Sequence, residues 1–189
     1  MKSIITILST AIIATLVSIP FAALGAQSNQ EEHATLARAL QNARLSLEDG
    51  LLASTREGTP ISVKYEIEDG KFQLSVYTLK GDTFREVIVD HTTGAVSKVA
   101  TITDAGDLAA ARRQTDAMNI AKRSLQAATA EVVKNNDGFR AVSAMPRVKE
   151  GYPAVEVTLT NGKDWKTVSE RLDDEDWLDD VETIGDDEY

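Results

Sequence analysis

Residues Asp90-His91-Thr92-Thr93-Gly94 combine an aspartate with one of the two histidines of the chain. Histidine titrates near neutral pH, so an Asp–His pair could exchange protons or help to bind a metal ion. Adjacent residues of a strand point to opposite faces, however, so Asp90 and His91 are not expected to converge on one substrate. A metal would need further ligands, and His33, expected to be solvent-exposed, lies far away near the N-terminus. The pattern favours a turn in which Asp90 accepts hydrogen bonds from amides and Gly94 supplies an unusual backbone angle.

The rest of the chain offers no clearer catalytic pattern. No serine stands in a Gly-x-Ser-x-Gly setting or beside a histidine, and acyl transfer needs a base within reach of the nucleophile. The chain has no cysteine, which excludes disulfides, thiolate metal sites and cysteine nucleophiles. The glycines are scattered singly and form no phosphate-binding loop. The sequence therefore predicts no catalytic residue, no cofactor and no defined metal site.

Residues 173–189 are strongly acidic. They contain the following ten acids and no base: Asp173, Asp174, Glu175, Asp176, Asp179, Asp180, Glu182, Asp186, Asp187 and Glu188. These acids account for the formal net charge of −10 and would repel phosphates, so nucleic acid and anionic membranes are not expected partners. The run lacks the spacing of an EF-hand loop, so weak attraction of divalent cations is expected in place of a defined site. Trp177 and Leu178 lie among these acids, which leaves open whether the tail docks on the sheet, binds a partner or stays without a fold.

The N-terminal residues 1–26 have the parts of a secretory signal peptide. Lys2 precedes an apolar stretch that Pro20 interrupts and small residues close, with cleavage expected near residues 23–26. The chain is therefore expected to be periplasmic or secreted, and membrane-bound only if this segment stays uncleaved.

Apolar spacing predicts two amphipathic helices. Residues 31–56 carry a stripe at helical spacing, made of Leu36, Leu40, Ala43, Leu47 and Leu51. Gly50 interrupts its last turn. Residues 115–135 repeat this pattern, and residues 103–114 read as a connector.

Elsewhere the apolar period is two, which predicts antiparallel strands with one buried face. The predicted strands span residues 61–67, 72–79, 83–90, 95–102, 139–148, 153–159 and 164–172. A shift of 81 residues matches Gly70 with Gly151, Gly81 with Gly162 and Phe84 with Trp165, and Phe84 and Trp165 are expected in the core. A shift of 78 matches Ser46-Leu47 with Ser124-Leu125. We expect an internal duplication of a helix followed by strands.

The chain resembles the PepSY domain of exported bacterial proteins in three successive parts. These parts are a helix, the segment Glu68-Asp69-Gly70-Lys71-Phe72-Gln73-Leu74-Ser75-Val76, and the segment Val87-Ile88-Val89-Asp90-His91-Thr92-Thr93-Gly94-Ala95-Val96. The likeness covers residues 34–99 well and residues 115–172 weakly, since the second copy lacks the Asp-x-x-Thr-Gly turn. The resemblance implies a helix on a small antiparallel sheet in each unit. It also implies a non-enzymatic module that binds, inhibits or regulates peptidases in the cell envelope.

The sequence thus predicts an α+β protein with a signal peptide (1–26), a first PepSY-like unit (27–102), a divergent second unit (103–172) and an acidic tail (173–189). The expected function is non-catalytic binding of a protein or peptide partner in the cell envelope. An exposed sheet edge could receive an extended peptide by strand addition. The alternatives are a structural subunit of a membrane-associated complex, an enzyme that depends on His91, and a divalent-cation binder that uses the tail.

Overall fold

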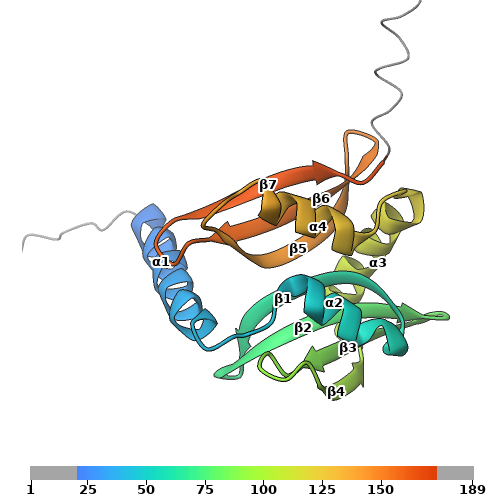
Figure 1. Cartoon of the computed structure of the whole chain (residues 1–189), viewed down its shortest axis with the longest axis horizontal. Coiled ribbons are helices and arrows are strands. Elements are labelled where there is room, and N and C mark those ends of the chain that lie inside the picture. The colour runs from blue at the N-terminus through green and yellow to red at the C-terminus, as the bar shows by residue number, and fades with distance from the viewer. Residues whose placement is uncertain (1–20, 174–189) are drawn as a thin grey trace, which may run out of the picture.

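The structure is a computed structural model that describes residues 21–173, with side chains from residue 30 onward (Figure 1). Its helices are α1 (Phe21–Leu40), α2 (Leu47–Ser54), the 3-10 turn η1 (Thr55–Glu57), α3 (Ala105–Ile120) and α4 (Leu125–Lys134). Its strands are β1 (Thr59–Glu68), β2 (Lys71–Lys80), β3 (Thr83–Val89), β4 (Val96–Thr101), β5 (Arg140–Lys149), β6 (Tyr152–Thr160) and β7 (Trp165–Arg171). Most of the expected signal peptide and acidic tail lies outside the described residues. Within residues 21–173 no helix is both long and apolar enough to cross a membrane.

The seven strands form one antiparallel sheet in the order β4-β3-β2-β1-β5-β6-β7. The predicted α+β class and the predicted strands are confirmed. Two small sheets were expected from the sequence, and the structure has one sheet instead, in which β1 and β5 are joined edge to edge. This junction, which we call the seam, has only two residue pairs, Val63 with Ala144 and Lys64 with Ser143.

Alternating side chains bury one face of the sheet under α2 and α4. Val63, Val76 and Val87 are opposite one another on successive strands and are at most 1% exposed. Leu47 of α2 and Leu125 of α4 belong to the same cluster of buried apolar side chains. Figure 1 shows the two helices on one side of the sheet, one over each half. The core therefore runs through both halves without interruption.

Helix α3 packs on the opposite face. Its Ala111 lies in a smaller apolar cluster with Ile61, Tyr77 and Ile102. The buried Gln114 accepts a hydrogen bond from Ser62 Oγ at 2.9 Å and donates to Met145 Sδ at 3.6 Å. Helix α3 thus contacts strands on both sides of the seam.

The prediction of one helix over residues 31–56 is wrong, because residues 41–46 separate α1 from α2. Ser46 starts α2 with a capping box: its hydroxyl accepts from Asp49 N, and the Asp49 carboxylate accepts from Ser46 N. The amides of Arg44 and Leu45 donate to the carbonyl of His91. The chain leaves the helix there because these amides bond the turn after β3.

The predicted connector 103–114 is also wrong, because residues 105–120 are helical. Asp104 caps α3 by accepting from the amides of Gly106 and Asp107. The predicted helix over 115–135 is divided at residues 121–124, where the amides of Lys122 and Arg123 donate to the carbonyl of Leu172. Ser124 then caps α4. The sequence did not indicate either break, because the helical spacing of apolar residues continues through both and neither contains glycine or proline.

The pairing of β5 with β6 repeats the pairing of β1 with β2 at a distance of 81 residues. All nine pairs correspond, from Thr59–Leu79 and Arg140–Thr160 onward, and so does the irregularity after Pro60 and Ala141. The connecting turns correspond as well: Asp69 and Glu150 have φ values of 49° and 52°, and each precedes a glycine of positive φ. Strand β4 has no counterpart after β7 within the described residues.

Gly50 lies where α2 approaches β2 most closely. A Cβ atom there would lie 2.7 Å from Leu74 Cδ2, and Leu74 is fully buried. At positions 78 and 81 residues later the chain has Ala128 and Val155, a larger helix residue facing a smaller strand residue.

We predict that Gly50→Ala lowers the free energy of unfolding by about 1–3 kcal/mol, since overpacking outweighs the gain of about 1 kcal/mol in helix propensity. Adding Leu74→Val, which recreates the Ala128–Val155 pair, should restore most of the loss. Urea denaturation of both variants checks this. A Gly50→Ala variant more stable than the parent would contradict the close packing of α2.

Candidate functional site

The turn predicted at Asp90–Gly94 is present. Asp90 Oδ1 accepts hydrogen bonds from Thr92 N at 2.9 Å, Thr93 N at 2.8 Å and Thr93 Oγ1 at 3.0 Å. These bonds from the turn hold the pKa of the Asp90 carboxyl below its ordinary value. Gly94 has a φ of 79°. The His91 ring packs at a tilt on Phe72, with centroids 4.8 Å apart. The carboxylate of Asp90 is thus engaged by its own turn.

A large concave surface lies beside the seam. It is a cleft of about 760 Å³ between residues 31–36 of α1 and strands β1, β5, β6 and β7, and we call it the seam cleft. Beyond Lys64 and Ser143, β1 and β5 no longer pair, and the cleft opens between them and α1. In Figure 1, α1 lies across the end of the sheet where these strands separate.

Arg140, at the start of β5, fixes the C-terminal end of α1 beside the seam. Its Nη1 donates to the carbonyl oxygens of Leu40 at 3.0 Å and Ala43 at 2.9 Å. Its Nη2 donates to the carbonyl of Leu45 and, at 3.3 Å, to the hydroxyl of Tyr65. The forked guanidinium supplies the separate donors that these carbonyls need. Arg140 therefore holds the α1–α2 connection against both central strands.

Aromatic and apolar side chains form much of the seam cleft. The His33 ring stacks on Trp165 of β7 with centroids 4.1 Å apart. Ile67 of β1 is 39% exposed, and Leu36 and Met145 also line the cleft. Pockets that combine apolar walls with a few polar groups are the usual form of ligand sites.

Several charged side chains also line the seam cleft. Glu31 and Glu32 contribute from α1, and Lys64 and Glu66 from β1. Lys64 Nζ lies 2.5 Å from Glu66 Oε2, so these two charges are paired. Apart from His33, the lining has three acids and one base, which favours a ligand with positive groups.

Next to the cleft, three carboxylates approach within 4.8 Å of one another, those of Glu66, Glu68 and Glu86. Burial and the charges of Glu68 and Glu66 raise the pKa of Glu86 above its ordinary value. Gln73 Nε2 donates to Glu68 Oε2 at 2.7 Å, and Lys64 pairs with Glu66. A divalent cation bound here would compete with both donors.

The structure brings together residues that were not predicted from the sequence to be neighbours. His33 is exposed as expected, but it lies in the cleft against Trp165 and 58 positions in sequence from His91. Trp165 and Phe84, predicted in the core, are half-buried at its margin. Arg140 was not predicted as a functional residue, because the partners of its side chain lie 75 or more residues away in sequence. Glu66 and Glu68 are two residues apart on β1 and therefore lie on one face of the sheet. This spacing was the feature of the sequence that could have predicted the carboxylate cluster.

The described chain is a mixed α+β protein with one antiparallel sheet. Its sequence matches no protein-family model and no curated protein. A solved structure with similarity to it is the crystal structure of a candidate lipoprotein, CD1622, from Clostridium difficile 630. That match has 16% sequence identity and a TM-score of 0.38, and it covers 64% of this chain and 79% of that chain. The resemblance to the PepSY domain stays a prediction from sequence.

We predict that Arg140→Ala lowers the free energy of unfolding by about 3 kcal/mol, because hydrogen bonds from a charged donor contribute about 1.5–3 kcal/mol and three carbonyls lose theirs. The measurement is urea denaturation at neutral pH. Arg147→Ala, on the same strand, is the control. Its side chain is 56% exposed and makes one ion pair with Glu156, so the loss should stay below about 1 kcal/mol. Equal losses in the two variants would contradict the role given to Arg140.

Proposed function

We propose that this chain is an exported, non-catalytic module that binds an extended peptide or protein segment in the seam cleft. The observation that carries the proposal is the opening of the sheet at its centre. Strand β1 pairs with β2 at nine positions but with β5 at two, so residues 65–68 have no strand partner on the β5 side of the described sheet. An unpaired strand edge is the surface to which an extended peptide adds by main-chain hydrogen bonds.

The lining of the cleft defines the class of segment that it would accept. Apolar side chains would pack on Ile67, Met145 and Trp165. Lysine or arginine would lie near Glu31, Glu32 and the carboxylates of β1. We therefore infer a preference for segments with an apolar centre and basic flanks. An acidic segment would meet uncompensated repulsion.

We further propose that the binding site is formed between two PepSY-like repeats. The matching registers of β1–β2 and β5–β6 support this, as do the serine caps of α2 and α4, Ser46 and Ser124. The connections preceding these helices also correspond: Arg44 and Leu45 donate to the His91 carbonyl, and Lys122 and Arg123 donate to the Leu172 carbonyl. Edge-to-edge joining of two such units creates a central seam that neither unit has alone.

The resemblance to the PepSY domain supports peptidases or other envelope proteins as partners. If the bound segment belongs to a peptidase, its binding in the seam cleft would inhibit or regulate that enzyme. No catalytic step is proposed. The carboxylate of Asp90 accepts hydrogen bonds from its own turn, and the ring of His91 packs on Phe72.

We predict that a labelled hexapeptide with an apolar centre and lysine or arginine at both ends binds the full chain, and that Ile67→Lys weakens binding at least about tenfold, which corresponds to about 1.4 kcal/mol. The added ammonium would repel the basic ends and remove an apolar contact. Fluorescence polarisation gives the dissociation constants. Acid-flanked peptides with the same centre should bind more weakly.

Val99→Lys is the matched control, because Val99 is also 39% exposed but lies on the edge strand β4. Its affinity for the peptide should equal that of the parent. Failure of all the basic hexapeptides to bind, or equal weakening by the two variants, would contradict the proposed site.

A further inference from the structure

We propose that the acidic segment after β7 binds in a second groove of this chain, between α3 and β5. This groove, which we call the α3 groove, measures about 460 Å³. Its lining includes Arg113 and Gln114 of α3 and Met145, Pro146, Arg147 and Val148 of β5. The occupant is residues 174–184, which contain Trp177 and Leu178 among acids.

The α3 groove presents both apolar surface and positive charge. Val148 is 46% exposed, and the Arg147 side chain is 56% exposed. Residues 145–148 pair with β6 but have no partner on the β1 side of the described sheet. Asp116 is the acid in this lining, and Glu156 pairs with Arg147 at 2.8 Å. Among the lining residues the two arginines, Arg113 and Arg147, outnumber the acid by one charge, and the ion pair with Glu156 already engages Arg147.

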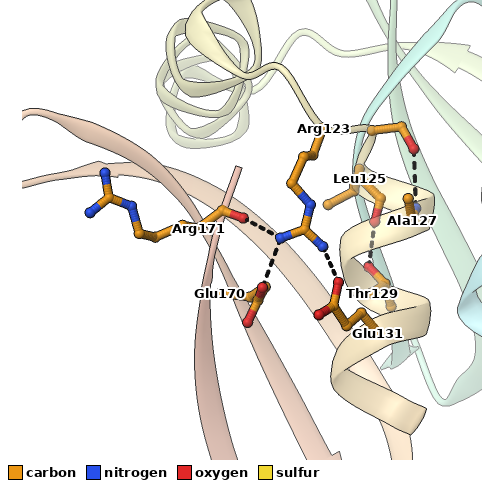
Figure 2. A network of polar contacts seen from close by, with 8 residues as sticks. Arg123, Leu125, Ala127, Thr129, Glu131, Glu170 and Arg171 are labelled. Atoms are coloured by element: carbon orange, nitrogen blue, oxygen red, sulfur yellow. Dashed lines mark hydrogen bonds and ion pairs between the residues drawn. The ribbon is translucent and has the colours of Figure 1, made fainter. Parts of the chain in front are cut away.

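The end of β7 is held in place where the acidic segment begins. The Leu172 carbonyl accepts hydrogen bonds from Lys122 N at 2.7 Å and Arg123 N at 2.8 Å. Figure 2 shows the Arg123 guanidinium between Glu131 of α4 and Glu170 of β7, with a further bond to the Arg171 carbonyl. These contacts tie β7 to α4 immediately before Asp173.

The side chain of Arg171 lies on the face of the sheet that carries the groove. Figure 2 shows its side chain pointing away from the Arg123 cluster. Its guanidinium bonds Asp173 at 2.6 and 2.9 Å, and this contact holds the pKa of the Asp173 carboxyl below its ordinary value. Arg171 pairs with Ala154, and Ala154 pairs with Arg147, so Arg171 and Arg147 lie on one face.

The distance to the groove is within reach of the segment. Two strand spacings separate Arg171 from Arg147, or about 10 Å. Trp177 follows Asp173 by four residues, and an extended chain advances about 3.3 Å per residue, or about 13 Å in all. Trp177 and Leu178 can therefore reach the apolar lining of the groove at the β5 edge, while Asp174 to Asp176 pass Arg147. An arginine also stacks well on an indole ring.

The test uses the intrinsic fluorescence of the full chain with Trp165→Phe, which leaves Trp177 as its single tryptophan. We expect a blue-shifted emission and weak quenching by acrylamide, both lost when Arg113→Gln and Arg147→Gln are added. Raising the salt from 0.1 M to 1 M shortens the Debye length from about 10 Å to about 3 Å, so it should shift the emission to the red. Circular dichroism confirms that each variant is folded.

The control variant carries Arg56→Gln and Lys71→Gln, which remove the same charge from exposed positions of the first half. It should keep the blue-shifted emission. Emission of a solvent-exposed tryptophan in the Trp165→Phe parent would overturn the proposal. So would an equal response of the two double variants. A blue shift that disappears on dilution would also overturn it, because it would place the segment on a second copy of the chain.

Discussion

The seam between β1 and β5 is the constraint on which the rest of the structure depends. Two residue pairs join the halves of a seven-stranded sheet, whereas β1–β2 and β5–β6 have nine pairs each. Such a short ladder needs support from the layers around it. That support comes from the continuous core under α2 and α4, from α3 on the opposite face, and from α1 at the open end. The early separation of β1 and β5 also leaves strand edges beside both the seam cleft and the α3 groove.

Long-range polar contacts hold the connections that surround the seam. Arg140 bonds carbonyls of the α1–α2 connection, and Arg123, in the α3–α4 connection, bonds β7. Both use the several donors of a guanidinium to satisfy groups from separate elements. The helix breaks that contain these contacts are therefore part of the packing. They allow each pair of helices to cover different parts of the sheet.

The sequence was informative where the relevant interactions are local. Alternation of apolar residues predicted all seven strands, and the Asp90–Gly94 pattern predicted the turn after β3. It failed at residues 41–46 and 121–124, where the amides that end each helix bond carbonyls of His91 and Leu172 far along the chain. The seam cleft could not be predicted either, because Trp165, Ile67 and His33 come together only after the strands pair. Helical spacing alone cannot report such contacts.

NMR titration of the full chain with a basic-flanked apolar hexapeptide tests the central claim most directly. If the segment adds at the seam, amide shifts change for residues 65–68 of β1 and for Val142 of β5, and these amides gain protection from hydrogen exchange. The edge strands β4 and β7 keep their exchange rates, apart from Trp165 at the rim of the cleft. Changes confined to β4 or the outer edge of β7, with the seam residues unaffected, would contradict the account.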